Sequence, residues 1–120
     1  MATRSITLEQ LLKPYEQANE QAPAVAANTN ILAADLTPVK PACLFRIQVC
    51  SDTAAVFNAI IVSGGNTQTV SFNDATDLTA DALYIFDLLV HAGDAINFQF
   101  DGAVNMLRIL RVQEIGAGVQ

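Results

Sequence analysis

The stretch LYIFDLLVHAGDAINFQF, residues 83–100, decides the fold class of this chain. Its first eight residues are apolar except for Asp87, and its last five alternate between apolar and polar side chains. Between them, His91-Ala92-Gly93-Asp94 has the composition of a tight turn. The pattern predicts two strands joined as a hairpin in the middle of the core.

Segments on both sides of this stretch repeat the period of two that is typical of strands. We expect a strand from Cys43 to about Ser51, a second hairpin through Ser63-Gly64-Gly65-Asn66, and a last strand over 104–115 whose alternation slips near Leu110. Some six strands, about ten residues apart and without intervening helices, are typical of antiparallel sandwiches and barrels. The sequence therefore predicts a mainly β domain over 42–120, an antiparallel β-sandwich of jelly-roll-like character.

The N-terminal part has a different pattern. Residues 5–22 have Thr7 as a candidate N-cap and Gln10 three positions later, which predicts a short N-terminal helix that Pro14 would kink or split. Its apolar stripe consists of Leu8, Leu11, Leu12 and Tyr15. This helix could pack on the body of its own chain, or it could dock the stripe on a neighbouring subunit.

Residues 21–41 are rich in Ala, Asn, Thr and Pro and predict an extended connector, which is long for a compact domain. We interpret residues 1–41 as a helix and extended arm outside the domain, so a chain lacking residues 1–40 should still fold. The residues expected to contact other subunits are the apolar ones of the arm: Leu8, Leu11, Leu12, Tyr15, Ile31, Leu32, Leu36 and Val39.

The composition limits the possible functions. The chain is 52% hydrophobic and only 15% charged, against roughly 25% charged in an average soluble domain. The surplus apolar surface predicts burial against other protein subunits, in an obligate homo-oligomer or in a larger assembly. A net charge of −6 argues against general nucleic-acid binding. No apolar run approaches the ~20 residues of a membrane helix, and the N-terminus lacks the apolar centre of a signal peptide. We expect cytoplasmic synthesis without export.

Catalytic and metal-binding patterns are sparse. His91 is the only histidine, so a catalytic triad or a zinc site has too few residues within one chain, although a site shared between subunits stays open. Asp74, Asp77 and Asp81 could bind Ca²⁺ or could serve capping and turn roles. With six Phe, two Tyr and no Trp, the chain is also poor in sugar-stacking residues. The sequence predicts a protein that is not an enzyme and has no cofactor.

Four segments of the predicted sandwich carry a resemblance to a known group of proteins. They are Phe72-Asn73 to Leu78, Leu83-Tyr84-Ile85-Phe86, Val90-His91-Ala92-Gly93-Asp94 with Ile96-Asn97-Phe98, and Val112-Gln113-Glu114-Ile115-Gly116. With them, residues 43–115 resemble the β-sandwich domains of small virion proteins of tailed bacteriophages, in particular head decoration (cement) proteins.

That resemblance implies a structural protein of the virion that binds the major capsid protein, assembles as a homotrimer and stabilises the phage head by protein–protein contacts. It also implies synthesis in the host cytoplasm and no catalytic residues. The alternatives are another virion component, such as a fibre, collar or tail-associated sandwich subunit, and a carbohydrate-binding module.

Overall fold

The computed structural model describes residues 14–21, 24–39 and 43–115. This part of the chain is mainly β, as the sequence predicts, and its one helical element is a 3₁₀ turn, η1 (Asn73–Ala75). None of its helices is long and apolar enough to cross a membrane. The strands are β1 (Tyr15–Glu20), β2 (Cys43–Ser51), β3 (Phe57–Ser63), β4 (Asn66–Ser71), β5 (Tyr84–Val90), β6 (Ala95–Phe100) and β7 (Leu107–Ile115).

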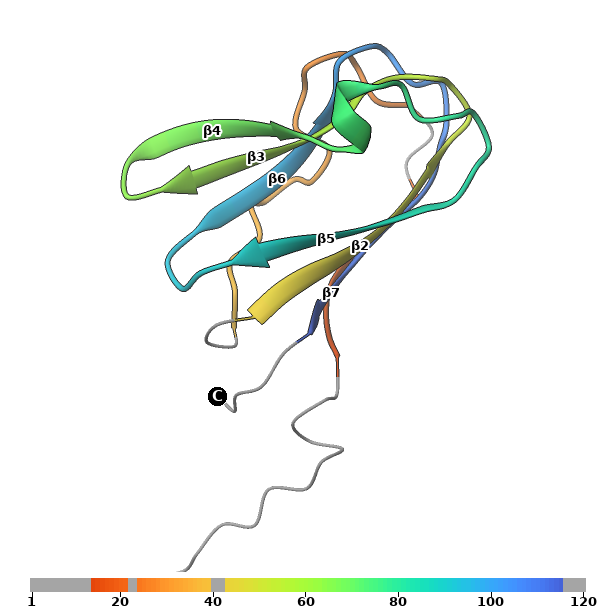
Figure 1. The fold of residues 1–120 in the computed structure, drawn as a ribbon. Coiled ribbons are helices and arrows are strands. Elements are labelled where there is room, and N and C mark those ends of the chain that lie inside the picture. Colours follow the sequence, from red (N-terminus) through yellow and green to blue (C-terminus); the bar gives the residue numbers. More distant parts are fainter. Residues whose placement is uncertain (1–13, 22–23, 40–42, 116–120) are drawn as a thin grey trace, which may run out of the picture.

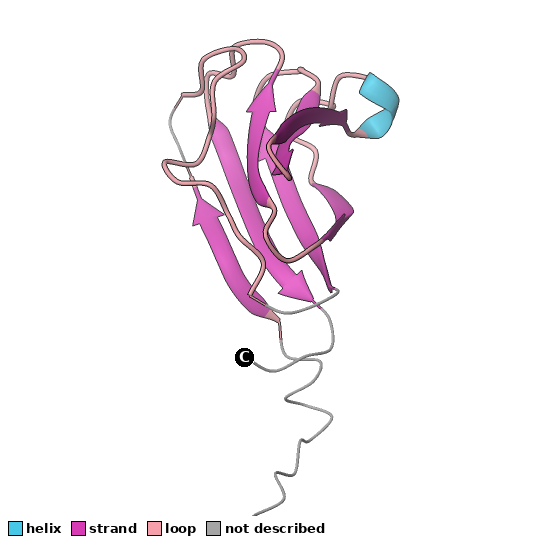
Figure 2. Cartoon of the chain, turned by 90° about the vertical axis from the view of Figure 1, so that its left-hand side faces the viewer, coloured by secondary structure: helices cyan, strands magenta, loops and turns pink. Residues whose placement is uncertain are grey.

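The strands form two antiparallel sheets (Figures 1 and 2). One sheet has the order β1-β7-β2-β5 and the other has the order β4-β3-β6. The alternating apolar residues of both sheets face a shared core, because a strand directs successive side chains to opposite faces. Among the fully buried side chains are Phe45, Ile47 and Val49 of β2, Phe57 of β3, Phe98 and Phe100 of β6, and Leu110 and Val112 of β7.

The central stretch forms two strands, but the prediction that they pair as a hairpin is wrong. β5 pairs with β2 in the four-stranded sheet, whereas β6 pairs with β3 in the other. The turn between them therefore carries the chain from one layer to the other, with Gly93 at φ +90° and the backbone N–H of His91 donating to Asp94 Oδ2 at 3.2 Å. The physical reason is burial, because each strand has an apolar face and this connection directs both faces into the same core.

The second predicted hairpin is confirmed. β3 and β4 pair from Asn58↔Ser71 to Ser63↔Asn66 around the two-residue loop Gly64-Gly65. Both glycines have positive φ, +58° and +83°, the combination that a tight type I′ turn requires and that residues with a side chain rarely adopt. The expected irregularity of the last strand is also present, as a register shift opposite Cys50 and Ser51 that leaves Arg108 unpaired in the β2–β7 ladder.

The prediction of a helix over residues 5–22 is wrong for residues 15–20, which form a strand. Residues 5–13 of the predicted helix lie outside the described residues. Tyr15–Glu20 forms strand β1, which pairs with β7 and has a bulge between Glu16 and Ala18. The guanidinium of Arg111 donates two hydrogen bonds to the carboxylate of Glu16, at 2.8 and 3.0 Å. Backbone bonds to the long β7 strand outweigh a weak local helix preference, because most of the stability of short helices comes from tertiary packing.

Residues 24–39 belong to the folded body along their whole length rather than to a free arm. They run beside β6, where the backbone N–H groups of Asn28, Ile31 and Leu36 donate to the carbonyls of Phe100, Phe98 and Ile96. Val25, Leu32 and Leu36 are buried in the core. A chain without residues 1–40 would lose β1 and these three side chains, so we expect it to unfold, contrary to the prediction made from the sequence.

Asn97 attaches this segment to β6 in a way that imitates a strand pair. Its side-chain Oδ1 accepts the backbone N–H of Leu32 at 3.1 Å, and its Nδ2 donates to the carbonyl of the same residue at 3.0 Å. An Asn side chain carries the same acceptor and donor as a peptide unit. The buried amide of Asn97 therefore supplies the two bonds that a neighbouring strand would otherwise make.

Candidate interaction surface

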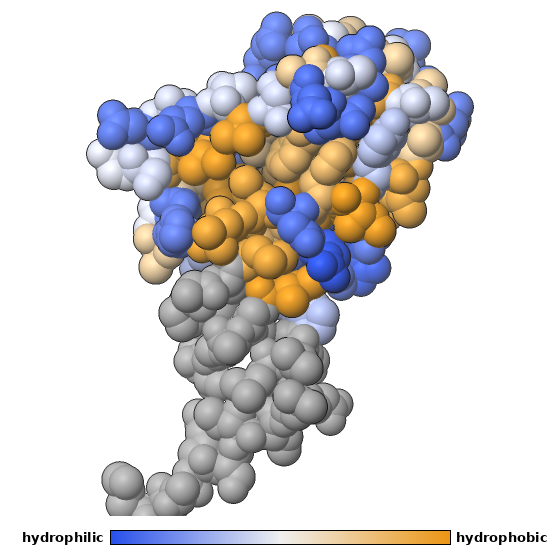
Figure 3. Space-filling view, in the orientation of Figure 1, coloured by the Kyte–Doolittle hydropathy of each residue, from blue (hydrophilic) through white to orange (hydrophobic). Residues whose placement is uncertain are grey.

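Apolar side chains are exposed along the outer face of β5. The alternation of this strand directs Ile85 and Leu89 outward, and they are 58% and 66% exposed, as is Leu83 immediately before the strand, at 58%. The neighbouring outward residue on β2 is Leu44, which pairs with Leu89. We call Leu83, Ile85, Leu89 and Leu44 the β5 surface. Figure 3 shows apolar side chains gathered over β5 and between β5 and the β3–β4 hairpin.

One ion pair interrupts the β5 surface without adding net charge to it. Asp87 lies between Ile85 and Leu89, and the Arg46 guanidinium donates two hydrogen bonds to its carboxylate, at 2.9 and 3.0 Å. These bonds lower the pKa of Asp87 below its ordinary value, so the carboxylate is ionised at neutral pH. Because the two opposite charges lie on adjacent strands, the pair adds no net charge to the β5 surface.

The inward side of β5 contributes half-buried aromatic rings. Phe86 lies 4.7 Å from Phe72 and 5.8 Å from Tyr84 between ring centroids. The hydroxyl of Tyr84 accepts the backbone N–H of Thr79 at 3.0 Å. These rings continue inward to Phe57, which is fully buried and stacks on three other phenylalanines. The aromatic residues therefore form a core cluster between the sheets and do not form an exposed row on which a sugar could stack.

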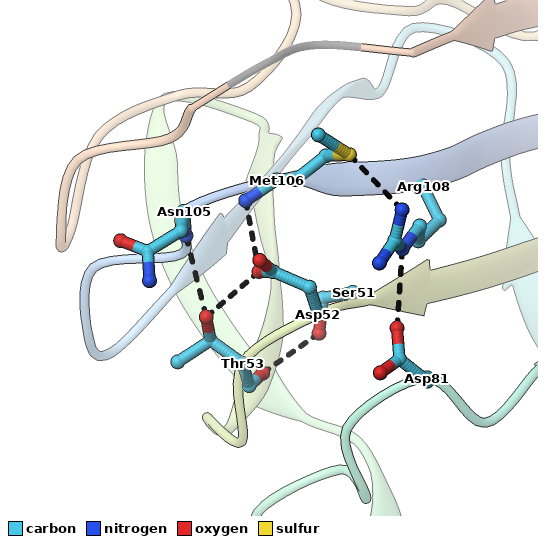
Figure 4. Close-up of polar contacts among 7 residues, drawn as sticks. All are labelled: Ser51, Asp52, Thr53, Asp81, Asn105, Met106 and Arg108. Atoms are coloured by element: carbon cyan, nitrogen blue, oxygen red, sulfur yellow. Dashed lines mark hydrogen bonds and ion pairs between the residues drawn. The ribbon is translucent and has the colours of Figure 1, made fainter.

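A polar cluster lies where β2 ends and β7 begins (Figure 4). Asp52 Oδ1 accepts the backbone N–H of Met106 at 2.8 Å and the hydroxyl of Thr53 at 2.7 Å. These bonds, that of Met106 first, lower the pKa of Asp52. Beside them, Arg108 Nε donates to Asp81 Oδ1 at 3.1 Å. The carboxylates are occupied by bonds that close the loops, which makes this cluster a structural corner of the fold.

The residues predicted as contact sites are distributed over different parts of the fold. Leu32 and Leu36 are 5% and 9% exposed in the core of their own chain, which leaves little of either side chain for the predicted contact with another subunit. Ile31 and Val39 are half-buried, and Tyr15 is exposed at the start of β1. Leu8, Leu11 and Leu12 lie outside the described residues. The structure brings none of the described ones together into a surface.

The polar candidates are also separate from one another. Asp74 and Asp77 are exposed near η1, whereas Asp81 binds Arg108. Within the described ranges, no group of three or more His, Cys, Asp or Glu residues is placed to hold a metal ion. His91 lies exposed on the turn that connects β5 to β6.

Sequence reasoning missed the β5 surface, although a signal for it was present. Apart from Asp87, residues 83–90 are apolar on both faces of the strand, and such a pattern predicts burial of both faces. Only the inward parity is buried or half-buried in the folded chain. An apolar strand with two apolar faces can occupy a central position or an edge that awaits a partner, and the periodicity does not distinguish the two.

No protein-family model matches the chain, and the comparisons with curated proteins and with solved structures found no match either. The β5 surface is therefore the basis for a proposal about function.

Proposed function

We propose that this chain is a non-enzymatic structural protein of a virion, a head decoration protein that stabilises the capsid of a tailed bacteriophage through multivalent protein–protein contacts. The observation that carries the proposal is the β5 surface, where Leu83, which immediately precedes the edge strand, and Ile85 and Leu89 on it are each more than half exposed. Exposed apolar patches on small domains mark sites of protein association. The low proportion of charged residues supports the same conclusion.

We also propose that the fold is a jelly roll, and the strand order supports this. A jelly roll has eight strands, with the first, eighth, third and sixth in one sheet and the second, seventh, fourth and fifth in the other; viral capsid domains use this architecture. If residues 24–39 take the place of the second strand, the sheets β1-β7-β2-β5 and 24–39-β6-β3-β4 follow that scheme. Two isolated bridges in this segment, Val25↔Val104 and Leu36↔Ile96, mark where it pairs.

In this function the chain supplies contacts and no chemistry. Copies associate with one another, and each copy binds the major capsid protein, so an assembly touches several capsid subunits at once. Later contacts are then effectively intramolecular, and individually weak sites produce tight attachment. For the capsid contact we propose the N-terminal leucines Leu8, Leu11 and Leu12, because the other apolar residues of the predicted arm are largely engaged by their own fold.

The test is binding to particles. Virions from the source of the sequence are purified, depleted of this protein and mixed with the purified chain, and co-sedimentation is measured. The full chain should bind the particles, and a chain lacking residues 1–13 should remain folded by circular dichroism and lose binding. A double variant at intervening positions, Glu9→Ala with Gln10→Ala, is the matched control and should bind normally.

Two results would contradict the proposal. Absence of the chain from purified virions, together with no binding of the full chain to depleted particles, would reject the virion function. Unchanged affinity of the chain lacking residues 1–13 would reject the N-terminal leucines as the capsid contact.

A further inference from the structure

Three of the four sheet edges are protected against pairing with another strand. The edges are β1 and β5 in one sheet and β4 and β6 in the other. β1 has a bulge between Glu16 and Ala18 and carries the exposed acidic residue Glu20. β4, with the sequence NTQTVS, is polar apart from Val70, and β6 is covered by residues 24–39. Bulges, charges, polar strands and covering segments are the usual ways in which proteins prevent edge-to-edge association.

β5 has none of these protections. It is seven residues long and pairs along one side with β2 from Val90 to Tyr84, in a register without a shift. Among the described residues no strand pairs with its other side. Its one charged residue, Asp87, is paired with Arg46 of the neighbouring strand β2. A regular apolar edge of this kind presents a row of backbone N–H and C=O groups that an additional strand can bind.

We infer that β5 is the self-association edge of this protein, and that it pairs antiparallel with β5 of a second copy across a two-fold axis. This inference deepens the proposed function, on which it rests for the association of copies. A symmetric contact requires a strand that is complementary to itself. The sequence of β5 provides such a register.

Two-fold pairing that keeps each side chain on its own face must place one residue opposite its own copy. If that residue is Asp87, two carboxylates face each other, which is unfavourable. If that residue is Phe86, its ring lies opposite the ring of Phe86 in the second copy. Leu83 then lies opposite Leu89 of the second copy, and Asp87 lies opposite Ile85 of the second copy. The second register places no like charges opposite each other and pairs apolar side chains on both faces.

The size of this contact sets its expected strength. One strand pair with its flanking side chains covers less than the ~1,600 Å² of a standard stable interface. We therefore expect a concentration-dependent dimer, in place of the homotrimer that the resemblance implies. In the dimer the two four-stranded sheets become one continuous sheet of eight strands, because β5 is the last strand of each.

Sedimentation equilibrium of the full chain over a range of concentrations tests the inference. The mass should rise from that of the 12.8 kDa chain to twice that value. Ile85→Asp places a carboxylate opposite Asp87 of the partner, and the two-fold axis repeats the pair. Its dissociation constant should therefore rise about tenfold or more. Ile85→Lys places a cation there instead, so this variant should dimerise at least as well as the wild type.

Tyr15→Asp is the matched control, because Tyr15 is 48% exposed at the opposite edge of the same sheet. This variant should dimerise normally. All variants are checked for folding by circular dichroism, and hydrogen exchange should show β5 amides that gain protection as the wild-type concentration rises.

Several outcomes would overturn the inference. They are a monomer at all concentrations, a trimer, equal weakening by Ile85→Asp and Ile85→Lys, or no change in the protection of β5. A failure of this kind is separable from a failure of the proposed function, because particle binding is measured independently of mass.

Discussion

Replacing Asn97 with alanine should weaken the attachment of residues 28–36 to β6 and destabilise the whole protein. Asn97 is 2% exposed, and its amide makes two bonds to Leu32 together with bonds to the N–H of Phe98 and the carboxylate of Asp35, at 2.8 and 2.9 Å. The substitution leaves the buried N–H and C=O of Leu32 without partners, and each unsatisfied group costs about 1–3 kcal/mol. We expect the free energy of unfolding to fall by about 3 kcal/mol.

Urea denaturation measures this change, with Asn19→Ala on the exposed face of β1 as the control, which should change stability by less than about 0.5 kcal/mol. Hydrogen exchange adds a local readout. The amides of Leu32 and Leu36 should exchange faster in Asn97→Ala than global unfolding explains. A loss below about 1 kcal/mol with unchanged exchange at Leu32 would show that the amide of Asn97 is not what holds the segment, because such a loss equals that of one ordinary hydrogen bond.

Three further predictions concern other buried or bonded groups. Glu114→Ala should cost about 2 kcal/mol or more, because the backbone N–H of Val39 and the amide of Gln17 both donate to this fully buried carboxylate; thermal unfolding in which Glu114→Ala is as stable as the exposed-site variant Glu20→Ala would contradict it. The pKa of Asp52 in the folded protein lies below its ordinary value of 3.8, so the bonds of its carboxylate stabilise the fold above that pH, and this stabilisation is lost as the pH falls through the folded pKa. Asp52→Asn should therefore lose less stability between about pH 6 and about pH 3 than the wild type. Parallel pH profiles of the two proteins in urea denaturation would refute this. Phe57→Ala should cost about 3–5 kcal/mol, because it opens a cavity among four neighbouring rings; an unchanged denaturation midpoint would show that the ring cluster does not carry the core.

The strands could be predicted from the sequence because their signals are local. The alternation around Phe45, Ile47 and Val49 and the two glycines after Ser63 each act within a few residues, and both features are present as predicted. The partner of each strand is not a local property. The turn at Gly93 fits a hairpin and a connection between sheets equally well, and only the competition of β2 and β3 for β5 and β6 decides between them.

The predictions for the N-terminal segments were wrong for the same reason, because the partners of these segments lie far away in the sequence. Tyr15–Glu20 has no strong strand pattern of its own and becomes a strand because the edge of β7 is open to it. The burial of Leu32 depends on Asn97, which lies 65 positions later in the chain. The exposed residues of β5 have the composition of core residues, and only the position of the strand in the sheet shows that they face outward.

The pairing of β1 with β7 has a consequence for synthesis on the ribosome. Tyr15 pairs with Glu114, and Gln17 donates to the same residue across 97 positions of the chain. At about 5–20 residues per second, the ribosome takes many seconds between making these two ends. During that time the partner of β1 and the strand that residues 24–39 cover do not yet exist. The sheet that contains both strands can be completed only after β7 has been made, so until then Val25, Leu32 and Leu36 of the nascent chain have no complete core to be buried in.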